Sequence, residues 1–263
     1  MIPGRRRILG VAGTLLGAGV AGALAGRLPS TAAATAPVSA APLPWPYPRL
    51  DPDVVAARAY WDYFDGHCMY GVFAGIVGEL AEKCGGPFRT FPLELMKYGA
   101  GGVAGWGTLC GTLNGAAAAI HLVSADPEPV IDEVFGWYSS ETLPDFVPEE
   151  SPKPLPRSVA RSPLCHVSVA EWCKVSGLDA YSVERNERCA RLAAATARHT
   201  VESLNLQQAG ALPLTHPVPE EVQLCRSCHE RGGQMANARG RMHCRACHPG
   251  IGADHLDASA KGK

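Results

Sequence analysis

Residues 51–86 read DPDVVAARAYWDYFDGHCMYGVFAGIVGELAEKCGG, and this stretch determines the fold class. Asp51 followed by Pro52 favours the start of a helix, because an aspartate caps exposed backbone amides and proline fits the first helical turn. Apolar side chains then recur at helical spacing until Cys84-Gly85-Gly86, a sequence typical of a helix end. We therefore predict one helix between Pro52 and Cys84.

The rest of the central part of the chain shows similar spacing, with proline-rich connectors and almost no strand alternation, so the predicted class is all-α. The sequence predicts further helices over residues 93–123, from Pro127 or Pro129 through Trp137, from Ser168 to about Val175, and from Ser182 or Glu184 through Leu204. Residues 139–164 are predicted to form an extended connector. Glycines are frequent over residues 66–78 and 99–115, which favours either tight helix packing or a backbone pressed against a prosthetic group.

Two pentapeptides of the form Cys-x-x-Cys-His lie near the carboxyl end: Cys225-Arg226-Ser227-Cys228-His229 and Cys244-Arg245-Ala246-Cys247-His248. Two thiols at this spacing can each add to a vinyl group of one haem, and the adjacent histidine can then bind the iron. Two such motifs rarely arise by chance in a chain with ten cysteines and nine histidines. The sequence therefore predicts two haem c groups, and the alternatives are a zinc site of four thiolates or disulfides.

Each haem iron has two axial positions to fill. The proximal ligands predicted from the motifs are His229 and His248. The candidates for the second position are, in order of preference, His243, His255 and His216. His243 directly precedes Cys244, so it is badly placed for its own haem and better placed for the other one. The thioether alternatives are Met235 and Met242, and a second histidine would give a lower potential than either.

Residues 1–40 have the composition of an export signal. An arginine cluster precedes an apolar segment rich in glycine and alanine, and Ala-x-Ala cleavage sequences follow. The tetrapeptide Arg6-Arg7-Ile8-Leu9 also fits a twin-arginine signal, a route that exports folded proteins. An uncleaved membrane anchor is the alternative. The sequence thus predicts a periplasmic protein with no membrane span in the mature chain.

Charge is distributed unevenly along the chain, although the net charge is only −1. Residues 1–40 contain four basic and no acidic side chains, residues 41–220 contain 13 basic and 21 acidic ones, and residues 221–263 contain seven basic and four acidic ones. We therefore predict three parts: the export signal 1–40, a helical body 41–220, and a short, loop-rich dihaem segment 221–263. No nucleic-acid partner is expected for a chain with so acidic a body.

Six cysteines lie outside the two haem motifs: Cys68, Cys84, Cys110, Cys165, Cys173 and Cys189. An even number of cysteines in an exported protein favours three disulfides. The alternative is an iron–sulfur or other non-haem iron centre held by four thiolates from separate helices. The twin-arginine signal favours the iron centre, because such centres are built in the cytoplasm and require export of a folded protein.

The dihaem segment has too few apolar side chains to cover two haems. After Cys225 they amount to little more than Met235, Met242, Ile251 and Leu256. Either the helical body or a second copy of the chain must therefore cover the rings, and either arrangement would bring the haems close together. The second of these arrangements is the first argument for a homodimer.

The cysteines and the glycine-rich sequence also match the pattern of a known family. The matching residues are Gly66-His67-Cys68, the sequence GGVAGWGTLCGTLNGA at residues 101–116, Cys165, Cys173 and Cys189. This set resembles the redox-active family named for its C_GCAxxG_C_C pattern. With the paired Cys-x-x-Cys-His motifs added, the chain is similar to the split-Soret cytochromes c of that family over roughly residues 50–255.

The resemblance implies a periplasmic homodimer with two bis-histidine haems in each subunit. It further implies that the haems are stacked closely, that the other subunit donates one axial histidine, and that a non-haem iron centre is present. Carried over to this sequence, it makes His229 and His248 the proximal haem ligands. It takes the cluster ligands from among Cys68, Cys110, Cys165, Cys173 and Cys189, whereas Cys84 has no place in the pattern.

These features predict an exported dihaem c-type cytochrome that transfers electrons between redox partner proteins. The alternative is a small haem-dependent reductase in which one iron keeps an open coordination position. A low-spin spectrum unchanged by carbon monoxide would favour the electron carrier, and carbon monoxide binding to a high-spin haem would favour the reductase. No other catalytic motif is present in the sequence.

Replacing His243 with alanine is expected to convert one of the two haems from low spin to high spin, because its iron would lose the second axial ligand. The absorption and EPR spectra of the oxidised variant measure this change. A spectrum that stays entirely low-spin would show that His243 is not an axial ligand.

Overall fold

The computed structural model describes residues 41–251 of the chain. The export signal predicted for residues 1–40 and the haem ligand predicted at His255 lie outside the described residues. Residues 41–251 are mostly helical, which confirms the predicted all-α class, and their regular strands are limited to the antiparallel pair β1 (Thr142–Leu143) and β2 (Ser158–Val159). The helices are α1 (Pro52–Cys84), α2 (Gly111–Val123), α3 (Pro127–Ser140), α4 (Cys165–Ser176), α5 (Val183–Gln208) and α6 (Glu220–His229).

Helix α1 folds back on itself at His67, where φ is 64° and ψ is −161°. Because of this reversal, Arg58 in the first half forms ion pairs with Glu79 and Glu82 in the second half. A straight helix would place those residues about 30 Å or more from Arg58. The sequence correctly predicts the start of α1, where the Asp51 side chain accepts hydrogen bonds from backbone amides, but it offers no sign of the reversal.

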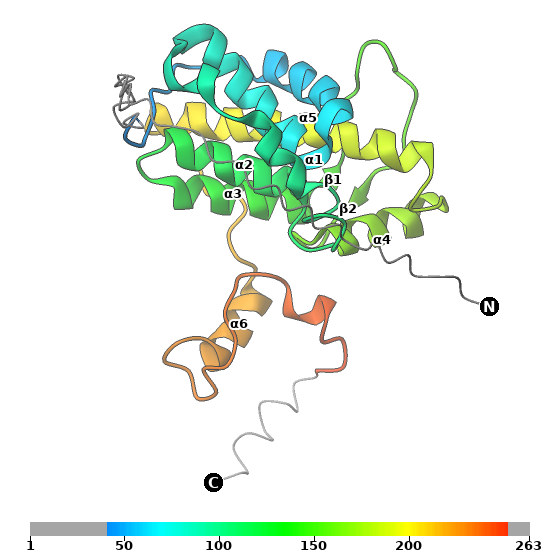
Figure 1. The fold of residues 1–263 in the computed structure, drawn as a ribbon. Coiled ribbons are helices and arrows are strands. Elements are labelled where there is room, and N and C mark those ends of the chain that lie inside the picture. The colour runs from blue at the N-terminus through cyan, green and yellow to red at the C-terminus, as the bar shows by residue number, and fades with distance from the viewer. Residues whose placement is uncertain (1–40, 252–263) are drawn as a thin grey trace, which may run out of the picture. The chain divides into compact units, whose positions relative to one another are not determined.

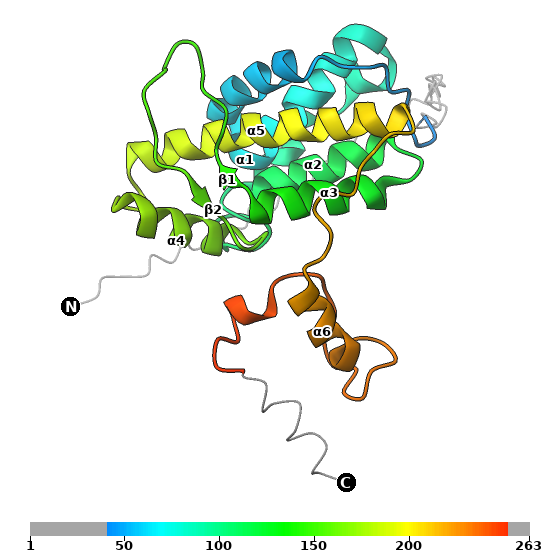
Figure 2. The same ribbon diagram turned by 180° about the vertical axis from the view of Figure 1, so that it is seen from behind.

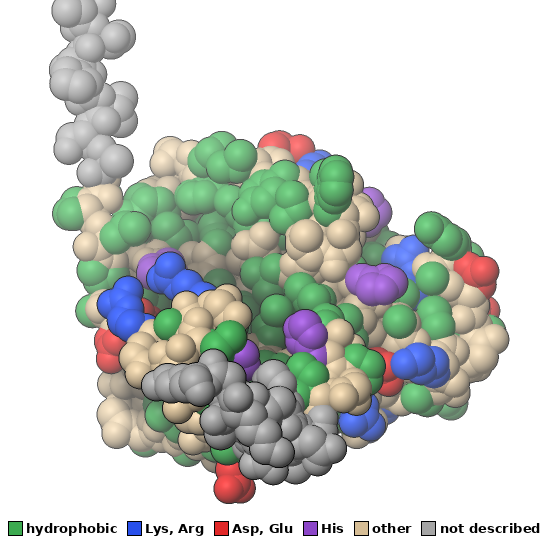
Figure 3. All heavy atoms as spheres, turned by 90° about the horizontal axis from the view of Figure 1, so that it is seen from below, with side chains coloured by type: hydrophobic (Ala, Val, Ile, Leu, Met, Phe, Trp, Pro, Cys, Tyr) green, Lys and Arg blue, Asp and Glu red, His purple; other side chains and the backbone are tan. Residues whose placement is uncertain are grey.

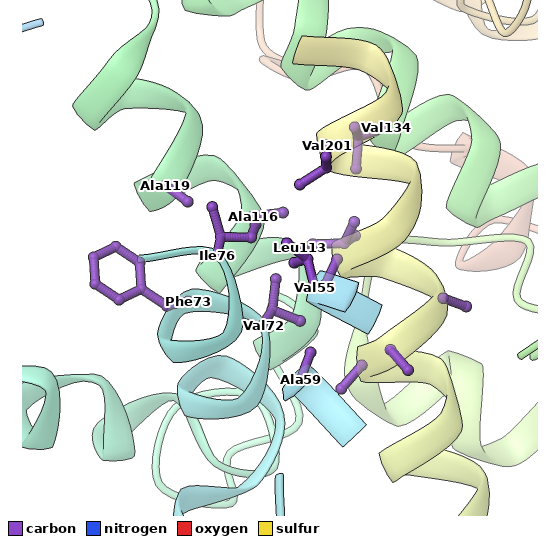
Figure 4. Packing of buried hydrophobic residues seen from close by; sticks show 14 of the residues in the cluster. Val55, Ala59, Val72, Phe73, Ile76, Leu113, Ala116, Ala119, Val134 and Val201 are labelled. Carbon is purple, nitrogen blue, oxygen red and sulfur yellow. The ribbon is translucent and has the colours of Figure 1, made fainter. Parts of the chain in front are cut away.

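The two halves of α1 pack closely because small residues lie between them. A Cβ atom added to Gly75 would lie 2.8 Å from the Cβ of Ala59 and 3.0 Å from the backbone of Ala59. Val55 and Ala59 of the first half lie near Val72 of the second half in the hydrophobic core (Figure 4). The glycine therefore serves tight helix packing, one of the two uses predicted for it.

The helix predicted over residues 93–123 is wrong in its first half. Residues Leu93–Gly99 form the 3₁₀ helix η2, a loop follows, and α2 begins only at Gly111. Four successive loop residues have positive φ angles, namely Gly101, Gly102, Val103 and Ala104. A right-handed helix cannot contain such a run of left-handed residues, so the glycines here form a turn.

Helix α5 runs along the helical body and packs against α1, α2 and α3 (Figures 1 and 2). It begins as predicted after Ser182, whose Oγ accepts a hydrogen bond of 3.1 Å from the Arg185 amide. Helix α4 begins at Cys165, so the cap predicted at Ser168 is wrong. Ser168 is buried inside α4, where its hydroxyl contacts Tyr138 and Arg188.

No helix in the described part of the chain has both the length and the apolar character needed to cross a lipid bilayer.

Replacing Gly75 with alanine is expected to destabilise the protein by about 1–3 kcal/mol, because the new methyl group would overlap the backbone of Ala59. In an exposed helix the same change would stabilise by about 1 kcal/mol. Chemical denaturation measures the sign, with Ala57→Gly on the exposed face of α1 as a control for helix propensity. A more stable Gly75→Ala variant would contradict the close packing of the two halves.

Candidate functional site

Four cysteines from four different elements come together in the helical body. Cys68 directly follows the reversal in α1, Cys110 precedes the first residue of α2, Cys165 is the first residue of α4, and Cys189 lies in α5. Cys68, Cys110 and Cys189 are buried, and Cys165 is half-buried. The four thiols are close enough to shift one another's ionisation.

Backbone pairing between two loops holds Cys110 beside Cys165. Leu109 and Leu164 form an isolated antiparallel bridge. The Cys110 amide donates to the Pro163 carbonyl at 2.8 Å, and the Cys165 amide donates to the Thr108 carbonyl at 2.7 Å. The glycine-rich turn before Thr108 thus brings two cysteines together that are 55 positions apart in the sequence.

Close packing of α2 on α1 holds Cys110 beside Cys68. A Cβ atom added to Gly111 would lie 2.7 Å from the Cβ of Cys68 and 2.9 Å from the Met69 amide. No larger residue fits at position 111 while α1 stays in place. The glycine next to Cys110 is therefore part of the structure that assembles the cysteine group.

The surroundings of the four thiols favour negative charge. Cys68, Cys110 and Cys165 lie at the amino ends of helical segments, where the backbone amides and the helix dipole stabilise anions. Two arginines, Arg185 and Arg188, flank Cys189 on α5. Thiolates, which are the form of cysteine that binds metals, are stabilised at such a site.

The ionisation of Cys189 and Cys68 reflects this arrangement. A hydrogen bond from the Cys68 thiol lowers the pKa of Cys189 to about 5 against the opposing effect of burial, and the Arg188 and Arg185 guanidiniums lower it further. The same hydrogen bond, together with burial, raises the pKa of Cys68. Burial raises the pKa of Cys165 to about 12, and the neighbouring thiolates raise it further. One thiolate is thus already stabilised before any ligand is bound.

Cys173 and Cys84 lie apart from this group. Cys173 is eight residues after Cys165 in α4, so it is about 12 Å further along the helix axis. Cys84 is exposed at the end of α1. All ten cysteines have free thiols, so the structure does not contain the three disulfides weighed as an alternative.

The four cysteines are donors of the type that iron–sulfur centres use. Within residues 41–251, no group of three or more His, Cys, Asp or Glu side chains surrounds one point closely enough to hold an ion. A centre with bridging sulfides is larger than one ion and draws its thiolates from a wider space. Four cysteines at an electropositive, mostly buried position match the Cys₄ ligation of such centres.

The two Cys-x-x-Cys-His motifs lie side by side in the carboxyl-terminal segment. The first occupies the last turns of α6, and the second lies at the 3₁₀ helix η3 (Cys244–Ala246). The pKa of Cys244 is raised by burial, by the nearby Cys225 and by a hydrogen bond between these two thiols. The first cysteines of the two motifs therefore lie near each other.

Apolar side chains around these motifs are uncovered. The exposed ones are Leu224, Met235, Met242 and Ile251, and Val222 is the buried side chain of α6. A haem attached to either motif would find apolar surface of this kind beside it. The residues present therefore fit two covalently bound haems.

Two of the predicted axial histidines are oriented by carboxylates. His216 Nδ1 lies 2.6 Å from Glu133 Oε1, and His243 Nδ1 lies 2.6 Å from Glu221 Oε1. A carboxylate on one ring nitrogen can orient an imidazole so that its other nitrogen faces a metal. In His216 that other nitrogen, Nε2, itself lies 3.4 Å from Glu141 Oε1. Of the predicted proximal ligands, His229 is hydrogen-bonded through Nδ1 to Asn237 Oδ1, and His248 is exposed. Histidine side chains are visible among hydrophobic ones on the face shown in Figure 3.

Glu133 is a buried carboxylate that sequence analysis missed. It is 3% exposed, and it accepts hydrogen bonds from the Thr215 amide, the Thr215 hydroxyl and the His216 amide at 2.6–3.1 Å. Although burial raises the pKa of Glu133, these hydrogen bonds and that of the His216 ring outweigh it, and the pKa lies below its usual value. The sequence did offer a sign of this site, because Glu133 is an acidic residue that lies with Val130 and Val134 on the buried face of α3.

Comparisons with known proteins agree with the resemblance seen in the sequence. The family described as "Putative redox-active protein (C_GCAxxG_C_C)" matches residues 67–203. The split-Soret cytochrome c of Desulfovibrio desulfuricans (strain ATCC 27774 / DSM 6949 / MB) is 39% identical over 220 residues, which cover 80% of this chain and 79% of that protein. A solved structure described as a novel iron centre in the split-Soret cytochrome c from Desulfovibrio desulfuricans ATCC 27774 superposes with a TM-score of 0.74 at 37% identity, covering 80% of this chain and 92% of that one.

Replacing Glu133 with glutamine is expected to lower the free energy of unfolding by about 1–3 kcal/mol at neutral pH, because charged hydrogen bonds to Thr215 and His216 would be lost. Since the pKa of Glu133 is depressed in the folded protein, its contribution is present above the usual glutamate pKa of about 4.3 and is lost as the pH falls through the folded pKa.

Denaturation curves of the wild type and the variant, measured between neutral and acidic pH, test this dependence. The exposed Glu128→Gln on the same helix is the matched control. A difference between wild type and Glu133→Gln that does not shrink toward acidic pH would contradict the assignment.

Proposed function

The chain belongs to the C_GCAxxG_C_C family of redox-active proteins, and on that basis we propose that it is an exported dihaem cytochrome c of the split-Soret type that carries electrons between redox partners. The pair of Cys-x-x-Cys-His motifs, whose first cysteines Cys225 and Cys244 lie near each other, is the observation that carries this proposal. It places the attachment points of two haems next to each other, as fast electron exchange between haems requires.

We propose that four thiols of the carboxyl-terminal segment bind the two haems covalently: Cys225, Cys228, Cys244 and Cys247. His229 and His248 then bind the two irons on the proximal side, because each directly follows a haem-binding cysteine. The chemistry that a bound haem c supplies is one-electron transfer at its iron, without transformation of a substrate.

His243 and His216 are the described candidates for the second axial position. Their Nδ1 atoms are held by Glu221 and Glu133, and a carboxylate at Nδ1 strengthens an imidazole as an iron ligand. By contrast, the Met235 and Met242 side chains are exposed, and no hydrogen bond within residues 41–251 fixes the orientation of either one. The geometry therefore favours bis-histidine ligation over histidine–methionine ligation.

We further propose that Cys68, Cys110, Cys165 and Cys189 hold an iron–sulfur centre. Their shared electropositive surroundings and the stabilised thiolate of Cys189 support this assignment. Cys173, the fifth candidate from the family pattern, lies too far along α4 to share the same centre. This iron–sulfur centre would give the protein a further electron-accepting group besides the two haems.

The proposal includes assembly and location. The uncovered apolar side chains beside the haem motifs support a homodimer, in which a second copy covers the rings. The arginine pair and apolar segment near the start of the sequence support export to the periplasm by the twin-arginine route. Folding before export would allow the iron–sulfur centre to be inserted in the cytoplasm.

Replacing Cys68 with alanine is expected to remove the non-haem iron and leave both haems in place, because the haem motifs lie in another part of the chain. Iron and acid-labile sulfide analysis, together with the pyridine haemochrome spectrum, measures the two cofactors separately. Cys173→Ala and the exposed Cys84→Ala are the matched controls and should retain the non-haem iron. Retention of this iron in Cys68→Ala would rule out the four-cysteine centre.

A further inference from the structure

Arg188 is a buried cation that no carboxylate neutralises among the described residues. It is 2% exposed, and its Nη2 donates to the Ser168 hydroxyl at 2.8 Å. Its Nε has no hydrogen-bond partner. Because a guanidinium does not lose its proton in proteins, this positive charge is costly in the interior unless a nearby negative charge offsets it.

The negative charge available to Arg188 is in the cysteine group. Its Nη1 lies 4.0 Å from Cys189 Sγ, and Cys110 is also near enough to interact with it electrostatically. A centre held by four thiolates is anionic and would offset the arginine. Arg188 and the four cysteines thus complement each other in charge.

The orientation of Arg188 is fixed by buried hydroxyl groups. The Tyr138 hydroxyl donates to Ser168 Oγ at 2.9 Å, and the same oxygen accepts the hydrogen bond from Arg188. Tyr138 and Ser168 are 0% and 1% exposed. The guanidinium is therefore held beside Cys189 by the protein itself, rather than by a bound ligand.

Arg191, one turn further along α5, shows that burial alone does not explain this arrangement. It is 3% exposed, similar to Arg188, but its Nε pairs with Glu187 at 2.7 Å. Its terminal nitrogens donate to the carbonyls of Ser151 and Lys153, both at 2.9 Å. The charge of Arg191 is thus offset by the Glu187 carboxylate, whereas the Arg188 guanidinium lies beside the Cys189 thiol.

We propose that Arg188 is a positioning residue whose fixed positive charge raises the reduction potential of the iron centre held by Cys68, Cys110, Cys165 and Cys189. The inference rests on the proposed function, because it requires that centre. One electron, donated by a haem in the protein or by dithionite in a titration, would reduce one iron of the centre from Fe(III) to Fe(II) and so add one negative charge to the centre as a whole. Arg188 stabilises this additional charge and so favours the reduced state.

An EPR-monitored redox titration of the complete protein, with haems and non-haem iron bound, tests the proposal. Arg188→Gln is expected to shift the reduction equilibrium of the non-haem centre at least tenfold toward the oxidised state, which corresponds to a potential lower by about 59 mV for one electron. Arg188→Lys keeps the charge and should stay closer to the wild type. Ser168→Ala keeps the arginine but removes the hydrogen-bond partner of its Nη2, so it should shift the potential in the same direction by less.

Arg191→Gln is the matched control, because it removes a buried charge from the same helix without touching the cysteines. An iron-loaded Arg188→Gln with an unchanged potential, or equal shifts in the Arg188 and Arg191 variants, would overturn the inference and leave the proposed function intact. Loss of the iron from Arg188→Gln but not from Arg188→Lys would support the need for a positive charge, and loss from both would overturn it. A wild type without non-haem iron would instead overturn the proposed four-cysteine centre, and the proposal that the two haems carry electrons would remain.

Discussion

The reversal of α1 at His67 is the constraint on which the cysteine group depends. The backbone of His67 lies in a region of φ and ψ that is almost restricted to glycine, at a cost of about 1–3 kcal/mol. The packing of the two helix halves around Gly75 and Ala59 offsets this cost. Cys68 directly follows the reversal, so the turn at His67 places this cysteine beside α2 and α5, where Cys110 and Cys189 lie.

The haem motifs could be predicted from the sequence and the cysteine group only in part, for a physical reason. Covalent attachment of a haem c requires a fixed local spacing of two cysteines and a histidine, which Cys225, Cys228 and His229 have, so the signal lies within five consecutive residues. The cysteine group is assembled through long-range packing, in which Gly111 contacts α1 and the Thr108 carbonyl accepts a hydrogen bond from the Cys165 amide. Sequence spacing alone could not show that Cys173 lies apart from the other candidate ligands. In the structure, Cys173 is eight residues after Cys165 in α4 and therefore about 12 Å further along the helix axis.

Helix boundaries were likewise predicted correctly where they depend on neighbouring residues and wrongly where they depend on distant parts of the chain. The caps at Asp51 and Ser182 act on their own neighbouring amides, and both were predicted correctly. The turn at residues 101–104 interrupts a segment whose apolar spacing favours a helix, and the residues that follow it, 107–110, pair with residues 163–166 instead of continuing a helix. The helix cap predicted at Ser168 was wrong for a related reason. The Ser168 hydroxyl forms hydrogen bonds with the distant Tyr138 and Arg188 and does not cap the helix end.

Buried charges link the helical body to its proposed redox groups. Glu133 is satisfied by hydrogen bonds from Thr215 and His216, and it holds the chain just before α6. Arg188 has no carboxylate partner among the described residues, and its Nη1 lies 4.0 Å from Cys189 Sγ. The most direct test of this account is the cofactor content of protein purified from a host that matures c-type cytochromes. We expect the mass of each chain to increase by two haems. We also expect acid-labile sulfide and more iron than the two haem irons account for. A chain with no added mass and no pyridine haemochrome absorbance would contradict it.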